Sequence, residues 1–183
     1  MTRWQFWFGL MTGCGPVAWG EPEPIVAVEG WRKWAGTDPF GVQPDDAYCD
    51  STSWGPADFG GEPTFDVQTQ FCSWLTVQQA TTTAVLRDDR VFLRLWHDTL
   101  TAWDEGVGAN LGLWVDGEIV WTTYIPIPAD GAIVLADLEL RRELPAGTLV
   151  AFHIDNHGAN SYHLLEVSRR PAVGRGDAVD VSP

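Results

Sequence analysis

Short runs of β-branched, aromatic and aliphatic residues alternate with turn residues over most of the chain between positions 64 and 168. No run keeps a 3.6-residue apolar period, so the pattern indicates strands and not helices. Short strands that follow one another without helices pair antiparallel, which predicts an all-β antiparallel sandwich. Eight strands are predicted: Thr64–Thr69, Phe71–Gln78, Arg90–His97, Asn110–Val115, Glu118–Ile125, Ala132–Leu140, Thr148–Asp155 and Tyr162–Ser168.

The dipeptide Asp116-Gly117 stands between two alternating runs and predicts a two-residue hairpin turn, because both turn positions need positive φ. With this turn, Leu113 faces Val120, and Trp114 and Trp121 become diagonal neighbours on one face of the sheet. Two tryptophans on one face could form a platform on which sugar rings stack. In a chain with 11 Trp, the simpler interpretation is that they fill the core.

Polar residues gather in the stretch 145–167, which holds three of the four histidines. Alternation places His153 and Asp155 on the face of their strand that is opposite to its core residues. The strand and its successor are expected to form a hairpin across the loop 156–161. That register puts His163 on the core side, whereas a loop one residue shorter puts it on the other side.

One interpretation of this polar cluster is a metal site. His97, His153, Asp155 and His157 would converge on one divalent metal, zinc or calcium, because imidazole and carboxylate groups are common metal ligands. Such a site would make the protein a metal-dependent enzyme. The tighter His-x-His grouping of cupin-like metal sites is missing from the sequence.

The other interpretation is structural, and it is the one that we favour, with no cofactor expected. The polar side chains would hydrogen-bond strand ends and the loop to each other, because Asn and Ser bond local backbone groups in turns. Tyr162, Asn156 and Asn160 lie at the same strand end and are also candidates for contacting a ligand.

The N-terminal residues have the pattern of an export signal. One basic residue, Arg3, precedes the apolar stretch Trp4–Met11, which is too short to span a bilayer. The segment Leu10-Met11-Thr12-Gly13-Cys14 resembles a bacterial lipobox, in which cleavage before the cysteine frees it for lipidation. A buried N-terminal strand or helix is the alternative.

This resemblance to bacterial lipoproteins implies a signal peptide at 1–13 and a lipidated tether at 14–24, whose Pro, Gly and Glu content suits a linker. It implies attachment to the membrane through the lipid on Cys14 alone. The protein would then lie in the cell envelope, in the outer membrane or at the cell surface.

A long irregular loop is expected over residues 30–63, which are rich in Pro, Gly and Asp. Its carboxylates do not have the spacing of an EF-hand, so a solvated loop is favoured over a calcium site. With Cys14 assigned to the anchor, Cys49 and Cys72 remain, and export to an oxidising compartment predicts a disulfide between them.

The net charge and the absence of catalytic motifs narrow the range of possible functions further. A formal charge of −14 argues against a nucleic-acid partner, whose phosphates would be repelled. The sequence has no Gly-x-Ser-x-Gly elbow, no phosphate-binding glycine loop and no HExxH motif. These patterns favour a non-enzymatic protein.

The turn-strand-loop-strand ending of the region 64–168 is similar to extracellular accessory β-sandwiches, including carbohydrate-binding jelly rolls and domains that follow secreted peptidases. The resemblance implies one jelly-roll-like domain over 25–168, followed by a flexible tail over 169–183. It also implies a binding protein for a polysaccharide or an envelope protein. A structural envelope protein without a small ligand is the third possibility.

Overall fold

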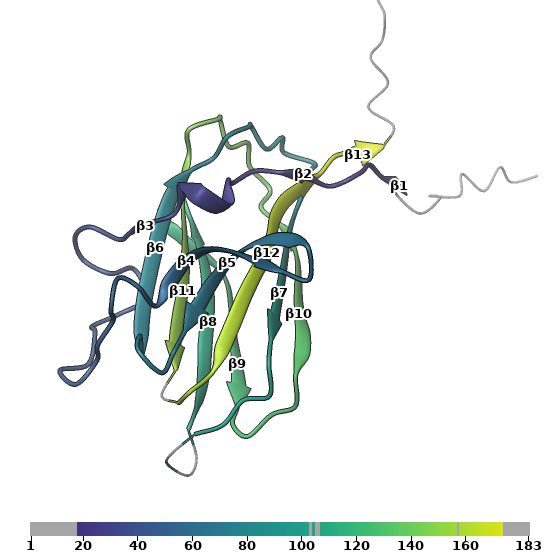
Figure 1. The fold of residues 1–183 in the computed structure, drawn as a ribbon. Helices are drawn as coiled ribbons and strands as arrows, with labels where there is room; N and C mark the ends of the chain where they lie inside the picture. The colour runs from purple at the N-terminus through teal and green to yellow at the C-terminus, as the bar shows by residue number, and fades with distance from the viewer. Residues whose placement is uncertain (1–17, 103, 105–106, 157, 174–183) are drawn as a thin grey trace, which may run out of the picture.

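Two antiparallel sheets packed face to face make up the protein in this computed structural model, which describes residues 18–102, 104, 107–156 and 158–173 (Figure 1). After the first hairpin of the sandwich, the chain changes sheet repeatedly on its way to the last long strand. The predicted antiparallel jelly-roll-like sandwich is confirmed.

The six-stranded sheet has the order β10-β7-β12-β5-β4, and β2 also pairs with β12. Its strands are β2 (Glu23–Pro24), β4 (Trp54–Phe59), β5 (Glu62–Gln68), β7 (Arg90–His97), β10 (Ala132–Glu139) and β12 (Ser161–Arg170).

The five-stranded sheet has the order β3-β6-β11-β8-β9. Its strands are β3 (Arg32–Lys33), β6 (Trp74–Ala80), β8 (Gly108–Val115), β9 (Glu118–Pro126) and β11 (Leu149–Asn156). A short 3-10 helix, η1 (Val28–Gly30), precedes β3, and β1 (Ala18–Trp19) pairs with β13 (Ala172–Val173).

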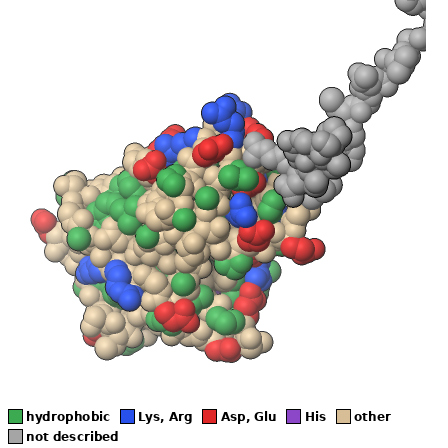
Figure 2. Space-filling model, turned by 90° about the horizontal axis from the view of Figure 1, so that it is seen from above, with side chains coloured by type: hydrophobic (Ala, Val, Ile, Leu, Met, Phe, Trp, Pro, Cys, Tyr) green, Lys and Arg blue, Asp and Glu red, His purple; other side chains and the backbone are tan. Residues whose placement is uncertain are grey.

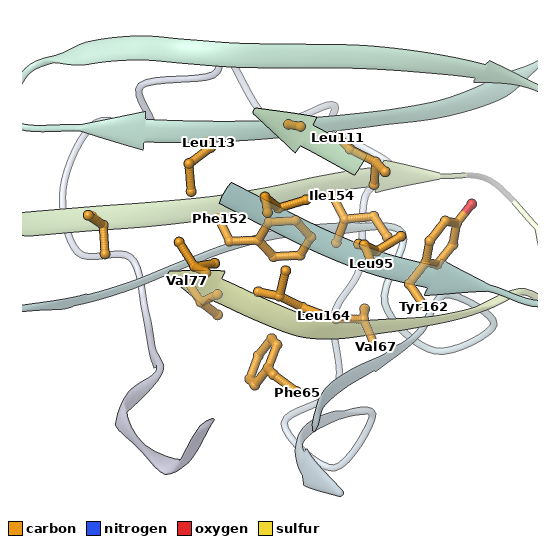
Figure 3. Close-up of a cluster of buried hydrophobic side chains, with 14 of the residues drawn as sticks. Phe65, Val67, Val77, Leu95, Leu111, Leu113, Phe152, Ile154, Tyr162 and Leu164 are labelled. Atoms are coloured by element: carbon orange, nitrogen blue, oxygen red, sulfur yellow. The ribbon is translucent and has the colours of Figure 1, made fainter. Parts of the chain in front are cut away.

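The core lies between the sheets and is built by the period-2 alternation of each strand. Val91, Leu93 and Leu95 of β7 are buried, while the residues between them face outward. Phe152 and Ile154 of β11 point into the same interior from the other sheet (Figure 3). Burying one such side chain contributes roughly 1.5–3 kcal/mol, so the shared core holds the two layers together.

All eight predicted strands are present; Arg90–His97 has the predicted bounds, and the other seven are shifted at one or both ends. Strand β4 was missed because it lies inside the region predicted to be irregular and contains Gly55 and Pro56. It is the last strand of its sheet, where a proline need not donate to a neighbour.

The predicted hairpin of β11 with β12 is wrong. β11 pairs with β6 and β8 in one sheet, whereas β12 pairs with β5 and β7 in the other. The segment between them therefore crosses from layer to layer. Both arrangements bury alternate residues of each strand, so the sequence pattern could not distinguish them.

His163 faces outward, and not toward the core. Tyr162, Leu164 and Val167 are the buried apolar residues of β12, and the pairing with β7 shifts between Leu164 and Glu166. This irregularity accommodates one extra residue, which changes the face on which the following side chains lie.

The hairpin of β8 with β9 has the predicted turn, with Asp116 and Gly117 both at positive φ. Its register then shifts, so that Leu113 pairs with Trp121 and not with Val120. The shift is a β-bulge, and it places the two tryptophans of the hairpin on different faces of the sheet.

The strands cross both expected domain boundaries, since β2 lies before residue 25 and β12 continues to Arg170. Arg169 contacts Glu23 at 2.6 Å and Asp89 at 3.1 Å, which ties these ends together. Figure 2, which views the molecule from above, shows basic and acidic side chains intermixed on that face. In the described part of the chain, no helix is long and apolar enough to cross a membrane.

Candidate functional site

A groove of about 390 Å³ lies on the outer face of the five-stranded sheet, the face turned away from the core. We call it the outer groove. Four strands and the loop between β3 and β4 supply its lining: Phe40, Trp74, Asn110, Leu111, Ile119, Thr122, Thr123, Tyr124, His153 and Asp155.

Strand alternation brings the polar groups of the outer groove together. Phe152 and Ile154 of β11 point into the core, so His153 and Asp155 must point outward. In the register of the sheet, His153 lies beside Thr76 of β6. The groove therefore lies on the outer, more polar face of strands whose other face is buried in the core.

One wall of the outer groove is the loop between β3 and β4, which crosses the outer face of the sheet. It is attached at its start by a hydrogen bond from the Trp34 amide to the Thr76 carbonyl, at 2.8 Å. At its far end, Cys49 and Cys72 form the predicted disulfide. A covalent bond thus holds a segment that has little regular structure.

Asp38 is the main polar contact of this loop with the sheet. Its Oδ2 atom accepts hydrogen bonds from Trp74 Nε1 at 3.0 Å and from Thr76 Oγ1 at 2.6 Å. Its Oδ1 atom accepts a bond from the Phe40 amide at 2.9 Å. One carboxylate therefore fixes both the loop and the outer side chains of β6.

His153 is enclosed by this arrangement. Phe40 stacks on its ring with 4.6 Å between centroids, and Trp74 meets the ring edge-on at the same distance. Thr76 Oγ1 lies 2.8 Å from the Nδ1 atom. Burial lowers the pKa of His153 to about 4, against the opposing attraction of Asp38, so the ring is neutral at pH 7.

Two glycines of β8 let aromatic rings approach the sheet. A Cβ atom on Gly112 would overlap the ring of Phe40, and one on Gly108 would overlap the ring of Tyr124. Tyr124 is nevertheless 54% exposed. Beside it, Asn110 Nδ2 donates to Asp155 Oδ2 at 3.1 Å. The groove thus combines an exposed aromatic ring with hydrogen-bonding groups.

The two tryptophans singled out in the sequence do not form a pair. Trp114 faces outward and packs edge-on against Trp34, with ring centroids 5.2 Å apart. Trp121 packs against the core, opposite the buried Leu113. The bulge in the hairpin places them on different faces, so the expectation that they share one face is wrong. Trp121 packs against the core, as in the simpler interpretation, and Trp114 does not.

Tyr162, Asn156 and Asn160 are brought together, but in the interior. Asn156 Nδ2 donates to the Tyr162 hydroxyl at 2.6 Å, and Asn160 Nδ2 donates to Asn156 Oδ1 at 3.0 Å. Asn160 also exchanges two hydrogen bonds with the Thr101 backbone. This network joins loops at one end of the sandwich and offers no exposed surface to a ligand.

The candidate metal ligands lie in different layers. His97 is on the inner face of the six-stranded sheet, with Nδ1 bonded to the Asp98 carbonyl, whereas His153 and Asp155 are on the outer face of the other sheet. His157 and the lipidation candidate Cys14 fall outside the described residues. Among the residues that the structure describes, no three His, Cys, Asp or Glu side chains form a metal-binding group.

Sequence reasoning found His153 and Asp155 but missed most of the outer groove. Tyr124 could have been found, because the period of two places it on the face of β9 opposite to the apolar residues Trp121 and Ile125. Asp38 and Phe40 gave no signal, because an irregular loop has no period from which its position on the sheet could be inferred.

No protein-family model matches this chain, and no curated protein sequence matches it. Solved structures do match. One is a carbohydrate-binding module of family CBM28, specific for non-crystalline cellulose, with 14% identity and a TM-score of 0.50, covering 84% of this chain and 96% of that one. Another is the CBM27-1 module of Caldicellulosiruptor saccharolyticus in complex with mannohexaose, with 10% identity and a TM-score of 0.50, covering 81% of this chain and 96% of that one. At these identities the likeness establishes the fold: the chain is a β-sandwich of the kind seen in carbohydrate-binding modules.

Proposed function

We propose that this protein is a non-enzymatic binding protein that holds a polysaccharide chain in the outer groove. The observation that carries the proposal is the exposed ring of Tyr124 next to the hydrogen-bonding groups of Asn110 and Asp155. Sugar rings present apolar faces that stack on aromatic side chains and hydroxyls that exchange hydrogen bonds at their edges. A groove with both features suits them.

The geometry supports binding rather than catalysis. Among the described residues that line the groove, Asp155 is the single carboxylate, and its Oδ2 atom already accepts a hydrogen bond from Asn110. Glycoside hydrolysis commonly uses two carboxyl groups facing one scissile bond. The match in fold to modules that bind cellulose and mannohexaose agrees with a binding role.

Isothermal titration against soluble polysaccharides tests this proposal. The panel should contain hydroxyethylcellulose, mixed-linkage β-glucan and galactomannan. Tyr124→Ala should weaken binding of the best ligand about 5- to 30-fold, since stacking on an exposed ring contributes on the order of 1–2 kcal/mol. Trp19→Ala, which removes another exposed aromatic ring far from the groove, should leave the affinity unchanged. Absence of binding to every member of the panel would end the proposal.

We propose in addition that a lipid on Cys14 holds the domain in the cell envelope. The lipobox-like segment before Cys14 supports this, and so does the Cys49–Cys72 disulfide, which is typical of an oxidising compartment. In the bacterial host, Cys14→Ser should move the protein from the membrane fraction to the soluble fraction. A variant that stays in the membrane fraction would refute the anchor.

A further inference from the structure

The two ring nitrogens of His153 have different surroundings. Nδ1 lies 2.8 Å from the Thr76 hydroxyl. Nε2 has no protein hydrogen-bond partner among the described residues. It is not fully buried either, so it is in contact with solvent. Because His153 lines the outer groove, the free nitrogen is the atom that a bound molecule can reach.

The neighbours of Thr76 decide which nitrogen carries the proton. Asp38 Oδ2, as a carboxylate, can only accept, so the single hydrogen of the Thr76 hydroxyl goes to Asp38. The Thr76 oxygen then accepts a hydrogen bond from Nδ1–H of His153. In a neutral imidazole the other nitrogen has no proton and is a hydrogen-bond acceptor.

A neutral ring is what the environment enforces. Phe40 and Trp74 enclose the imidazole, and this burial is the cause of its lowered pKa. The charged groups near the ring are Asp38 on the loop and Asp155 on the same strand; neither can donate a hydrogen bond to a ligand.

Asp155, two residues further along the same strand, supplies a second acceptor to the outer groove. Asp155 uses Oδ2 for the bond from Asn110, which leaves Oδ1 without a protein partner among the described residues. No lysine or arginine is among the described residues that line the outer groove. At His153 Nε2 and Asp155 Oδ1, a carboxylate or sulfate on a ligand would therefore meet two acceptors and no cation.

We infer that His153 Nε2 and Asp155 Oδ1 form a subsite that accepts hydrogen bonds from the hydroxyls of an uncharged glycan and rejects anionic sugars. Thr76 and Asp38 are positioning residues, which fix the proton of His153 on the nitrogen that faces away from the ligand. The inference rests on the proposed polysaccharide binding and adds to it the chemical class of sugar.

The first test needs no ligand. The ¹⁵N chemical shifts of the His153 side chain at pH 7 distinguish a protonated from an unprotonated ring nitrogen. We expect Nδ1 to carry the proton in the wild type and in Thr76→Ser, which keeps a hydroxyl. In Thr76→Val, which keeps the shape and removes the hydroxyl, we expect the proton to move to Nε2. A wild-type protein with its proton on Nε2 would overturn the inference.

The second test measures discrimination. The best-bound neutral polysaccharide of the panel is compared with its C6-carboxylated derivative in 0.5 M salt, where long-range repulsion is screened. The wild type and Thr76→Ser should prefer the neutral form at least about tenfold, which corresponds to about 1.4 kcal/mol. Thr76→Val should lose most of this preference, because Nε2–H can then donate to a carboxylate.

The three proteins have the same net charge, so overall repulsion cannot explain a difference between them. An unchanged preference in folded Thr76→Val, or equal binding of both glycans by the wild type, would overturn the inference and leave the proposed function intact. If the wild type binds no glycan of the panel, the proposed function fails, and the subsite with it.

Discussion

The ring of Phe40 lies nearly parallel to the imidazole of His153, with 4.6 Å between centroids and 13° between planes. The two residues come from an irregular loop and from a central strand of the five-stranded sheet. Gly112 makes the contact possible, because any side chain at that position would occupy the space of the Phe40 ring. The loop therefore covers one face of the His153 ring and limits its contact with water.

Phe40→Ala should raise the pKa of His153. Opening one face of the ring to water relieves part of the desolvation that lowers the value to about 4, and an increase of about one pH unit or more is expected. The measurement is an NMR titration of the His153 ring protons. Phe59→Ala is the matched control, because Phe59 stacks in the same way on His163 in the other sheet. An unchanged His153 pKa in Phe40→Ala would mean that Trp74 and the sheet alone exclude water.

The free energy of unfolding should fall as the pH falls from about 6.5 to about 4, in part because of His153. Its pKa is lower in the folded protein than in the unfolded chain, so in this interval the unfolded state binds a proton that the folded state does not. Above this interval the ring is neutral in both states, and the full stability is present. The slope from this single group is at most about 1.4 kcal/mol per pH unit.

Denaturant unfolding at pH 6.5 and pH 4.5 checks this dependence. The loss of stability in His153→Gln should be smaller than the loss in the wild type by about 2 kcal/mol, because the variant cannot take up the proton. The comparison uses the change in the free energy of unfolding between the two pH values. Any loss of stability that His153→Gln causes equally at both pH values therefore cancels. Equal losses in the two proteins would show that carboxylates dominate the acid sensitivity.

The fold could be predicted because alternation is a local signal. The strand Arg90–His97 shows it plainly, with every second residue buried, and its bounds were predicted as the structure has them. The assignment of strands to sheets could not be predicted in the same way. β11 and β12 bury alternate residues whether they pair with each other or lie in opposite layers.

The candidate site was only half predictable. His153 and Asp155 follow from the alternation of β11, but the residues that surround them come from elsewhere in the chain. Asp38 reaches Trp74 and Thr76 through a loop without a period. The bulge between Leu113 and Trp114 places the two tryptophans on different faces. A bulge adds one residue to a strand, and the pattern of apolar and polar positions in the sequence does not show where this happens.

Tyr162→Phe should destabilise the protein without changing polysaccharide binding. The Tyr162 hydroxyl accepts the hydrogen bond of Asn156 Nδ2, and both residues are fully buried. Removing the hydroxyl leaves a buried amide group without that partner, which costs about 1–3 kcal/mol. Denaturant unfolding and titration with the best-bound glycan measure the two effects.

Tyr124→Ala provides the reverse case, since it alters an exposed ring of the outer groove and leaves the interior network intact. It should lose affinity and keep most of its stability. If Tyr162→Phe lost affinity while retaining its stability, the buried network would have to be counted as part of the binding site.

Reduction of the Cys49–Cys72 disulfide should loosen the wall of the outer groove before it loosens the sheets. The bond closes a loop with a sequence separation of 23, and its removal should lower the free energy of unfolding by roughly 3 kcal/mol. Locally, the segment 34–48 would lose the covalent attachment that follows it and keep only its hydrogen bonds to the sheet region, at Trp34, Asp38 and Tyr48. Segments with few regular hydrogen bonds open first.

Hydrogen exchange followed by mass spectrometry distinguishes this local effect from global unfolding. In the double variant Cys49→Ala/Cys72→Ala, exchange should accelerate first in 34–48, while β7 and β11 stay protected under native conditions. Affinity for the glycan should fall in the same variant. Asp38 and Phe40 lie in the released segment, and they hold His153 in place. If exchange in 34–48 matched that of the oxidised wild type, the hydrogen bonds of Trp34, Asp38 and Tyr48 would be sufficient to hold the wall, and the disulfide would act on overall stability alone.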